Sequence, residues 1–162
     1  MATSNPNQPI GRRRPVHWPS FERDGVPVLI FVTVCSTGRK PILANSVAVT
    51  AVLDAWDKAD GWLVGRYAIM PDHIHFFCAP NSDFTLKTWM KYWKTLVSMN
   101  WPNFHEQPIW QDDFWDTQLR DGESYSGKWE YVRNNPVRHQ LVQRAEDWPW
   151  AGEIHSLGWY EP

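Results

Sequence analysis

The stretch Tyr67-Ala-Ile-Met-Pro-Asp-His-Ile-His-Phe-Phe-Cys78 places His73 and His75 inside an apolar run that is typical of a buried strand. Side chains alternate between the two faces of a strand, so both imidazoles point to one face while Ile74 and Phe76 point to the other. Two imidazoles side by side on a rigid strand form half of a metal site. A working site here needs a further ligand and a reactive group from elsewhere in the chain.

The pattern of apolar residues predicts the elements around this stretch. Short runs of β-branched and aromatic residues predict strands at 28–35, 62–70, 73–79 and within 109–119. The Pro71-Asp72 pair predicts a tight turn, which makes the second and third strands a hairpin. Apolar residues at helical spacing predict three helices: 46–58 with Asn45 as N-cap, one capped by Asp83 that runs through Met99, and one capped by Asp121 that runs to about Asn135, where Pro136 ends it.

The order β-α-β-β-α-β-α with a central hairpin predicts an α+β fold, an antiparallel sheet with helices mainly on one face. Residues 141–162, which include Trp148-Pro-Trp150, predict an irregular tail packed across the sheet. Residues 1–20 are polar and proline-rich and contain Arg12, Arg13 and Arg14, so they predict a flexible basic arm. Residues 21–162 are then expected to form a single domain.

Charge limits the partners of this chain. A formal net charge of −2 argues against indiscriminate binding of polyanions, so contact with nucleic acid needs a local basic patch. Lys87, Lys91 and Lys94 are spaced to line one exposed helix face, which makes them candidates for a phosphate track or an ordinary solvated face. Most of the 12 tryptophans are expected in the core, while exposed ones could stack on unpaired bases.

Cysteine content and hydropathy indicate a cytoplasmic protein. Cys35 and Cys78 are the only cysteines and form no CxxC pair, which favours reduced thiols over a zinc ribbon or a disulfide scaffold. No apolar run approaches the ~18 residues of a membrane span, and the polar start lacks the apolar segment of a signal peptide. We therefore expect no membrane partner.

The third predicted helix holds the candidates for the rest of the site. Tyr125, Trp129 and Val132 define its apolar stripe, whereas Tyr131 falls well away from that stripe. Asn135 follows four residues later on the same side, and its amide can bind a metal ion. Ordinary alternatives are a surface tyrosine, helix-stop chemistry in Asn134-Asn-Pro136, and a histidine pair with a structural role.

Four blocks of the sequence resemble a known family. Tyr67-Ala-Ile-Met-Pro-Asp-His-Ile-His75 resembles the signature of the single-tyrosine HUH transposases, which include the IS200-like transposases. The later blocks of the REP-associated tyrosine transposases resemble three further parts of the sequence, in the family's order. These are Trp110 to Asp116 with Leu119-Arg-Asp121, Tyr131 to Val137, and Asp147-Trp-Pro-Trp150. Departures from the family pattern are Gly127 in the third helix and Ala151-Gly152 after the closing block.

The resemblance implies a ferredoxin-like or RRM-like HUH endonuclease fold and roles for individual residues. His73 and His75 match the metal ligands, Tyr131 matches the nucleophile, and Asn135 stands where a polar residue completes the metal site, which suits Mg²⁺ or Mn²⁺. The implied activity is cleavage and rejoining of single-stranded DNA near REP-like hairpins through a 5′-phosphotyrosine intermediate, by a monomer or homodimer. The residues expected to contact DNA are Arg12, Arg13, Arg14, Lys87, Lys91, Lys94, Arg120, Arg133 and Arg138.

Three other functions compete with this one. A domesticated protein on the same fold would bind single-stranded DNA or RNA hairpins without cleaving them. A metal-dependent hydrolase would hold zinc with the two histidines and His105 or Asp72, and would form no covalent adduct. A structural domain would have no site, and the four ordered blocks make this alternative the weakest.

Overall fold

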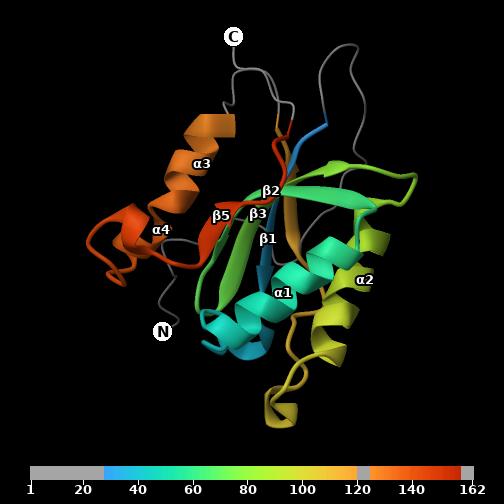
Figure 1. The fold of residues 1–162 in the computed structure, drawn as a ribbon, viewed down its shortest axis with the longest axis horizontal. Helices are drawn as coiled ribbons and strands as arrows, with labels where there is room; N and C mark the ends of the chain where they lie inside the picture. Colours follow the sequence, from blue (N-terminus) through green and yellow to red (C-terminus); the bar gives the residue numbers. More distant parts are fainter. Residues whose placement is uncertain (1–27, 120–124, 158–162) are drawn as a thin grey trace, which may run out of the picture.

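The computed structural model describes residues 28–119 and 125–157, which form one five-stranded antiparallel sheet with helices on both faces (Figure 1). The strand order is β4-β1-β3-β2-β5. The strands are β1 (Ile30–Cys35), β2 (Trp62–Ile69), β3 (His73–Pro80), β4 (Trp115–Gln118) and β5 (Ala151–Glu153). The helices are α1 (Ser46–Lys58), α2 (Leu86–Met99), α3 (Tyr125–Arg133) and α4 (Asn135–Arg138), with short 3-10 turns at Thr37–Arg39, Phe104–Glu106 and Ala145–Asp147.

The central strand of this sheet is β3, which pairs with β2 in the predicted hairpin and with β1 along its other edge. In this register Thr33 lies opposite His75 and Cys35 lies opposite His73. The row that contains His75 continues through Trp115 on β4 and Ala68 on β2. Directly opposed residues of antiparallel strands share a face, so this row crosses the sheet on the side of the histidines.

The two faces of the sheet carry different helices (Figure 1). The larger core cluster joins α1 and α2 to the side chains of Val32, Ile74 and Phe76. The smaller cluster joins α3 to Leu29 and Phe77. Because Phe76 and Phe77 are neighbours on β3, they show that α1 and α2 cover one face and α3 the other. The expected α+β antiparallel fold is confirmed, with the two longer helices on one face and α3 on the face of the histidines.

The starts of the first two helices test the predicted caps. The Asn45 side chain accepts a hydrogen bond from the backbone N–H of Ala48, as expected for an N-cap. The cap predicted at Asp83 is wrong. Thr85 has extended backbone angles and its hydroxyl accepts from the N–H of Thr88, so α2 begins at Leu86. Aspartate and threonine are both good N-cap residues, so the sequence alone did not decide between Asp83 and Thr85.

The end of the third helix differs from the prediction. We expected one helix to run to about Asn135 and to stop before Pro136, but α3 ends at Arg133 and α4 begins at Asn135. Pro136 occupies the first turn of α4, where the missing N–H of proline costs no helical hydrogen bond. The predicted start at Asp121 lies outside the described residues. Asn135 is therefore the first residue of a new helical turn.

The tail is more regular than the sequence indicated. Ala151–Glu153 form β5, which pairs with Arg66 to Ala68 of β2. The carbonyl of Ile69 accepts a hydrogen bond from the Trp148 indole at 3.1 Å. A Cβ atom at Gly152 would lie 3.0 Å from the Tyr67 hydroxyl, so a larger residue at this departure from the family pattern would require Tyr67 to shift. The helices of the described residues include none that is long and apolar enough to cross a membrane.

Candidate active site

His73 and His75 project together from β3 onto the α3 face of the sheet, as the sequence predicts. Their ring centroids lie 4.7 Å apart, and the ring planes are nearly perpendicular. His73 is 7% exposed, while His75 is partly buried. The pair lies close enough for both rings to contact one small ion.

A second layer of residues holds one nitrogen of each ring. The Nδ1 atom of His73 lies 2.7 Å from Oδ1 of Asp72, and Nδ1 of His75 lies 2.8 Å from the hydroxyl of Thr33. A carboxylate only accepts hydrogen bonds, so His73 donates its Nδ1–H and keeps the lone pair on Nε2. Ligand histidines are commonly oriented by such a carboxylate. In both rings, Nδ1 is engaged and Nε2 is the atom left for a ligand.

Electrostatics keeps these groups in the protonation states that metal binding needs. The hydrogen bond from His73 and the Arg39 guanidinium lower the pKa of Asp72 to about 2, against the effect of burial. Burial, followed by the charges of His73 and Arg138, lowers the pKa of His75 to about 3. At neutral pH Asp72 is thus ionised and His75 is a neutral imidazole, the form that can bind a metal ion.

Asn135 completes the group that the sequence predicts. Its side chain is buried, with 6% exposure, and its Nδ2 lies 3.3 Å from Nε2 of His73. The short α4 brings the amide to this position from the end of α3. The amide carries an oxygen as well as a nitrogen, so a rotation of the group presents an oxygen ligand beside the imidazoles.

Tyr131 is 61% exposed, which confirms its predicted place off the apolar stripe of α3. The guanidinium carbon of Arg138 lies 3.8 Å from the centre of the Tyr131 ring. Arg138 donates to the main-chain carbonyl of Tyr131 at 2.6 Å and to Oδ1 of Asn135 at 3.4 Å. The break between α3 and α4 means that Tyr131 and Asn135 are not neighbours on one continuous helix. Instead, Arg138 links them.

Three more residues on this face were not singled out from the sequence. The Phe31 ring stacks on His75 at 5.4 Å, and the Lys128 ammonium lies 5.1 Å from the centre of the Phe31 ring. The centroid of the His139 ring lies 6.4 Å from that of His73. Lys128 precedes Tyr131 by three residues on α3, and this spacing was a signal for a cation near that tyrosine.

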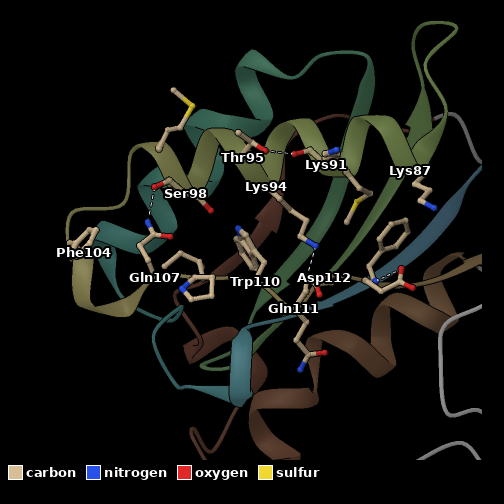
Figure 2. Close-up of a pocket in the computed structure, with 16 residues that line it drawn as sticks. Lys87, Lys91, Lys94, Thr95, Ser98, Phe104, Gln107, Trp110, Gln111 and Asp112 are labelled. Carbon is tan, nitrogen blue, oxygen red and sulfur yellow. Dashed lines mark hydrogen bonds between the residues drawn. The ribbon is translucent and has the colours of Figure 1, made fainter.

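The predicted lysine row lies on the other face of the sheet. Lys87 and Lys91 are exposed on α2, but Lys94 is partly buried and donates to the carbonyl of Gln111 at 2.7 Å (Figure 2). Burial lowers the pKa of Lys94. The expectation of three exposed lysines on one face is therefore wrong for Lys94. The row lines a groove of about 730 Å³ between α2 and residues 104–114, where Asp112 also lies.

Of the other residues predicted to contact DNA, one arginine is paired with carboxylates and four lie outside the described residues. Arg133 lies 3.5 Å from Glu130 and 4.0 Å from Glu146, so two carboxylates share its charge. Arg12, Arg13, Arg14 and Arg120 lie outside the described residues. Ten tryptophans lie within the described ranges, and these ten are all buried or partly buried. Fully exposed tryptophans for base stacking are thus not found in this part of the chain, although partly buried Trp115 lies on the face of the histidines.

The donor set fits a mixed nitrogen and oxygen site better than a zinc site. Within residues 28–119 and 125–157, no group of three or more histidine, cysteine, aspartate or glutamate side chains could hold a metal ion. His105 lies on the exposed turn Phe104–Glu106, and Asp72 is engaged with His73. The zinc hydrolase alternative therefore lacks a third ligand there. Two imidazoles and one amide oxygen fit a divalent ion that accepts nitrogen and oxygen ligands.

Comparison with known families places the chain. The family described as "Transposase IS200 like" matches residues 29–125, more than half of the chain. The chain belongs to this family. The match includes both histidines of the candidate site and ends before Tyr131. The assignment of this chain to the family therefore rests on the segment that contains the histidine pair, and does not depend on the proposed nucleophile.

Two curated relatives agree with the expected branch. A protein of Haemophilus influenzae whose name assigns it to the REP-associated tyrosine transposases is 30% identical over 110 residues, covering 56% of this chain and 62% of the relative. The REP-associated tyrosine transposase of Escherichia coli K12 is 25% identical over 89 residues, covering 54% of this chain and 52% of the relative. The chain thus matches between one half and two thirds of the length of each.

A solved structure shares the fold. The structure of a REP-associated tyrosine transposase bound to a REP hairpin superposes with a TM-score of 0.68 and 19% identity, covering 88% of this chain and 82% of the other. These findings confirm the resemblance to the REP-associated tyrosine transposases, and the chain shares the fold of the solved structure.

Proposed function

We propose that this IS200-like transposase cleaves and rejoins single-stranded DNA with Tyr131 as nucleophile. The observation that carries the proposal is the contact between Asn135 and His73, 3.3 Å between Nδ2 and Nε2. Arg138 extends this contact to the carbonyl and the ring of Tyr131. An exposed tyrosine linked through Arg138 to a buried amide and a histidine pair suits a nucleophile beside a phosphate-binding centre.

The chemistry of the tyrosine follows from its leaving-group properties. The Tyr131 oxygen attacks the scissile phosphorus and loses its proton, while the bond from phosphorus to the 3′ oxygen breaks. The products are a 5′-phosphotyrosine and a 3′ oxygen, which takes up a proton to become a 3′-hydroxyl. A phenolate is also a good leaving group, so attack by a 3′-hydroxyl on the phosphotyrosine regenerates Tyr131 and rejoins the strand.

His73, His75 and Asn135 would hold the divalent ion, Mg²⁺ or Mn²⁺, through two Nε2 atoms and an amide oxygen. When bound, such an ion polarises a phosphate and stabilises negative charge on its oxygens. The protein itself supplies the orientation. Asp72 and Thr33 hold the outer nitrogens of the rings, and Arg138 holds the amide. Because the ring contacts exist before DNA binds, both imidazoles are preorganised, whereas the Asn135 amide has to turn to present its oxygen.

The proposed substrate is a single strand next to a REP-like DNA hairpin. A structural relative is bound to a REP hairpin, and the chain shares its fold. Lys128 and Arg138 supply positive charge on the α3 face, and a chain of net charge −2 needs such a local patch to contact DNA. Partly buried Trp115 lies on the same face, where an unpaired base could stack on it. The other proposed contacts to the DNA backbone remain Arg12, Arg13, Arg14, Arg120, Lys87 and Lys91.

Asn135 contacts His73 of the same chain, and Arg138 links Asn135 to Tyr131. We therefore propose that a monomer is sufficient for cleavage. Light scattering during size exclusion, combined with an activity assay on each peak, tests this part. Activity confined to a dimer peak would contradict it.

The test of cleavage uses a denaturing gel. Purified protein is mixed with labelled single-stranded oligonucleotides that carry hairpins from its own genome, with Mg²⁺ or Mn²⁺, beside a Tyr131→Phe variant. The expected result is a slower band that depends on the metal ion, disappears after protease treatment and is absent from the variant. Cleavage without this band would support a hydrolase instead.

Binding without cleavage of any of these oligonucleotides would support a domesticated protein that binds hairpins. Including oligonucleotides with each REP-like hairpin of the genome, together with 5′ and 3′ flanks, makes this outcome decisive. Binding in this assay must also survive in Tyr131→Phe. Loss of binding in a folded Tyr131→Phe protein would contradict the role assigned to the tyrosine.

A further inference from the structure

The Asp72 carboxylate is held on both of its oxygens. Oδ1 accepts from Nδ1 of His73 at 2.7 Å, and Oδ2 accepts from Nε of Arg39 at 2.9 Å. A carboxylate that is held at one oxygen can turn about its Cβ–Cγ bond, whereas one that is held at both has a fixed plane. Arg39 thus sets the direction from which Asp72 meets the imidazole.

Arg39 is itself anchored to the strand next to the histidines. Its Nη1 lies 3.1 Å from the Sγ atom of Cys35, the last residue of β1. Cys35 is buried and lies directly opposite His73 in the sheet. The guanidinium therefore bridges the end of β1 and the residue that precedes His73 on β3.

The loop between β1 and α1 closes around the same aspartate. The backbone N–H of Ser36 donates to the carbonyl of Asp72 at 3.0 Å, and the buried Ser36 hydroxyl lies 3.1 Å from this carbonyl and 2.8 Å from that of Lys40. Leu43 donates from its backbone to the carbonyl of Pro71 at 2.9 Å. The main chain and the side chain of Asp72 are thus fixed by one loop.

Arg39 has a backbone conformation that its side chain does not favour. Its φ is 55° and that of Gly38 is 63°, both in the left-handed region. An arginine pays a steric cost there that a glycine would not. Such strain persists where surrounding contacts hold it, often beside functional sites. Here the contacts with Asp72 and Cys35 hold it.

We propose that Arg39 is a positioning residue for the metal site, acting through Asp72 on the orientation and tautomer of His73. This inference rests on the proposed function, because it assumes that Nε2 of His73 binds a metal ion. Arg39 is 52% exposed, so its charge is also accessible to solvent. A direct contact of Arg39 with a DNA phosphate is the alternative that the experiments must separate.

The first experiment measures Mn²⁺ binding without DNA, by titration calorimetry, in Arg39→Gln, Asp72→Asn and the double variant. Loss of a carboxylate partner of a ligand histidine weakens metal binding by about 10- to 100-fold. We expect about 10-fold or more for Asp72→Asn, about 3- to 10-fold for Arg39→Gln, and less than about twofold for Arg39→Gln when Asp72 is already Asn. Equal effects of Arg39→Gln in both backgrounds, or no effect in the wild-type background, would overturn the proposal.

The second experiment needs neither metal nor activity. Long-range ¹H–¹⁵N correlation spectra of the metal-free protein report which nitrogen of His73 carries the proton. We expect proton on Nδ1 in the wild type, and a mixture of tautomers in Arg39→Gln. An unchanged His73 signal in a folded Arg39→Gln protein would exclude positioning through Asp72. If the tautomer shifts but the wild type forms no covalent adduct, the proposed function fails and the positioning role stands.

Two further variants control for charge and folding. Arg144→Gln removes an arginine that also pairs with an aspartate, Asp147, but does so on the surface. It should change neither Mn²⁺ affinity nor the His73 signal. Arg39→Lys keeps the charge without the planar donor group, so it should restore only part of the affinity. Full restoration by lysine would show that charge alone matters and would contradict positioning through the Nε contact.

Discussion

The two faces of the sheet differ, because one holds the larger apolar cluster and the other the candidate site. The face under α1 and α2 packs a continuous apolar cluster that includes Trp56, Trp89 and Trp93. The face under α3 has a smaller cluster, and beside it lie the paired histidines and Asn135. A polar site needs neighbours that leave it room and supply hydrogen bonds, so it lies where apolar packing is least complete. Alternating side chains on β3 serve both faces at once.

Two exposed tyrosines on opposite faces give the largest expected contrast. Tyr131 on α3 is 61% exposed and Tyr92 on α2 is 52% exposed, so removal of either hydroxyl leaves the fold intact. Tyr131→Phe should reduce strand cleavage by more than about 10³-fold, since it removes the proposed nucleophile. Tyr92→Phe should leave cleavage within about twofold. Initial rates from gels with a hairpin oligonucleotide measure both. Similar rates for the two variants would remove the distinction between the faces.

A matched pair of phenylalanines tests which face holds the fold together. Phe76 and Phe77 are both fully buried, and they point to opposite faces of β3. Phe76→Ala should lower the free energy of unfolding by about 3–5 kcal/mol, because the large cluster cannot close around the cavity. Phe77→Ala should cost less, because α3 can move toward the sheet. Chemical denaturation measures both values.

The same variants should differ in local opening. Phe77 contacts Tyr125 of α3, with ring centroids 4.7 Å apart, so Phe77→Ala should lose hydrogen-exchange protection in α3 before the sheet unfolds. Phe76→Ala should lose protection throughout the sheet. A greater loss of global stability in Phe77→Ala would show that the α3 face carries more of the fold than its smaller cluster indicates.

The sequence predicts well what depends on local spacing. The alternation in His73-Ile-His75 was enough to place both imidazoles on one face, and Asn45 capped α1 as expected. Helical spacing also placed Tyr131 off the apolar stripe. Each of these results depends on residues within about one helical turn or one strand. Local pattern therefore supplied the histidines and the tyrosine of the candidate site.

The sequence could not supply what depends on distant pairing. Thr33 supports His75 only because β1 and β3 pair in one register, 42 residues apart. Arg39 reaches Asp72 through a left-handed turn, and β5 carries too few residues for a periodic signal. The link between Tyr131 and Asn135 through Arg138 needed the break at Asn134, which helical spacing does not predict. These features come from tertiary structure.

The pH dependence of stability should report on the histidine face alone. The folded pKa of His75 is about 3, below its ordinary value of 6.5, so the unfolded chain binds an extra proton between these two values. Stability is fully present above pH 6.5 and is lost as the pH falls, by on the order of 3 kcal/mol by pH 4. Denaturation curves from pH 7 to 4 measure this loss. His75→Gln should show a smaller loss, while the exposed His155→Gln should behave as wild type. Equal pH profiles in the three proteins would contradict burial of a neutral His75.

The smallest expected effect concerns the lysines on the α2 face. If the DNA strand wraps around the sheet edge to this face, Lys87 and Lys91 contact phosphates and Lys94, already bound to Gln111, does not. Each phosphate contact to a single strand adds about 0.7 to the slope of log affinity against log salt. The Lys87→Gln, Lys91→Gln double variant should therefore lower the slope by about 1.4 and weaken binding a few-fold at moderate salt. Lys58→Gln, on α1, should leave the slope unchanged. Fluorescence anisotropy over a salt series measures it, and an unchanged slope in the double variant would confine the DNA to the face of the histidines.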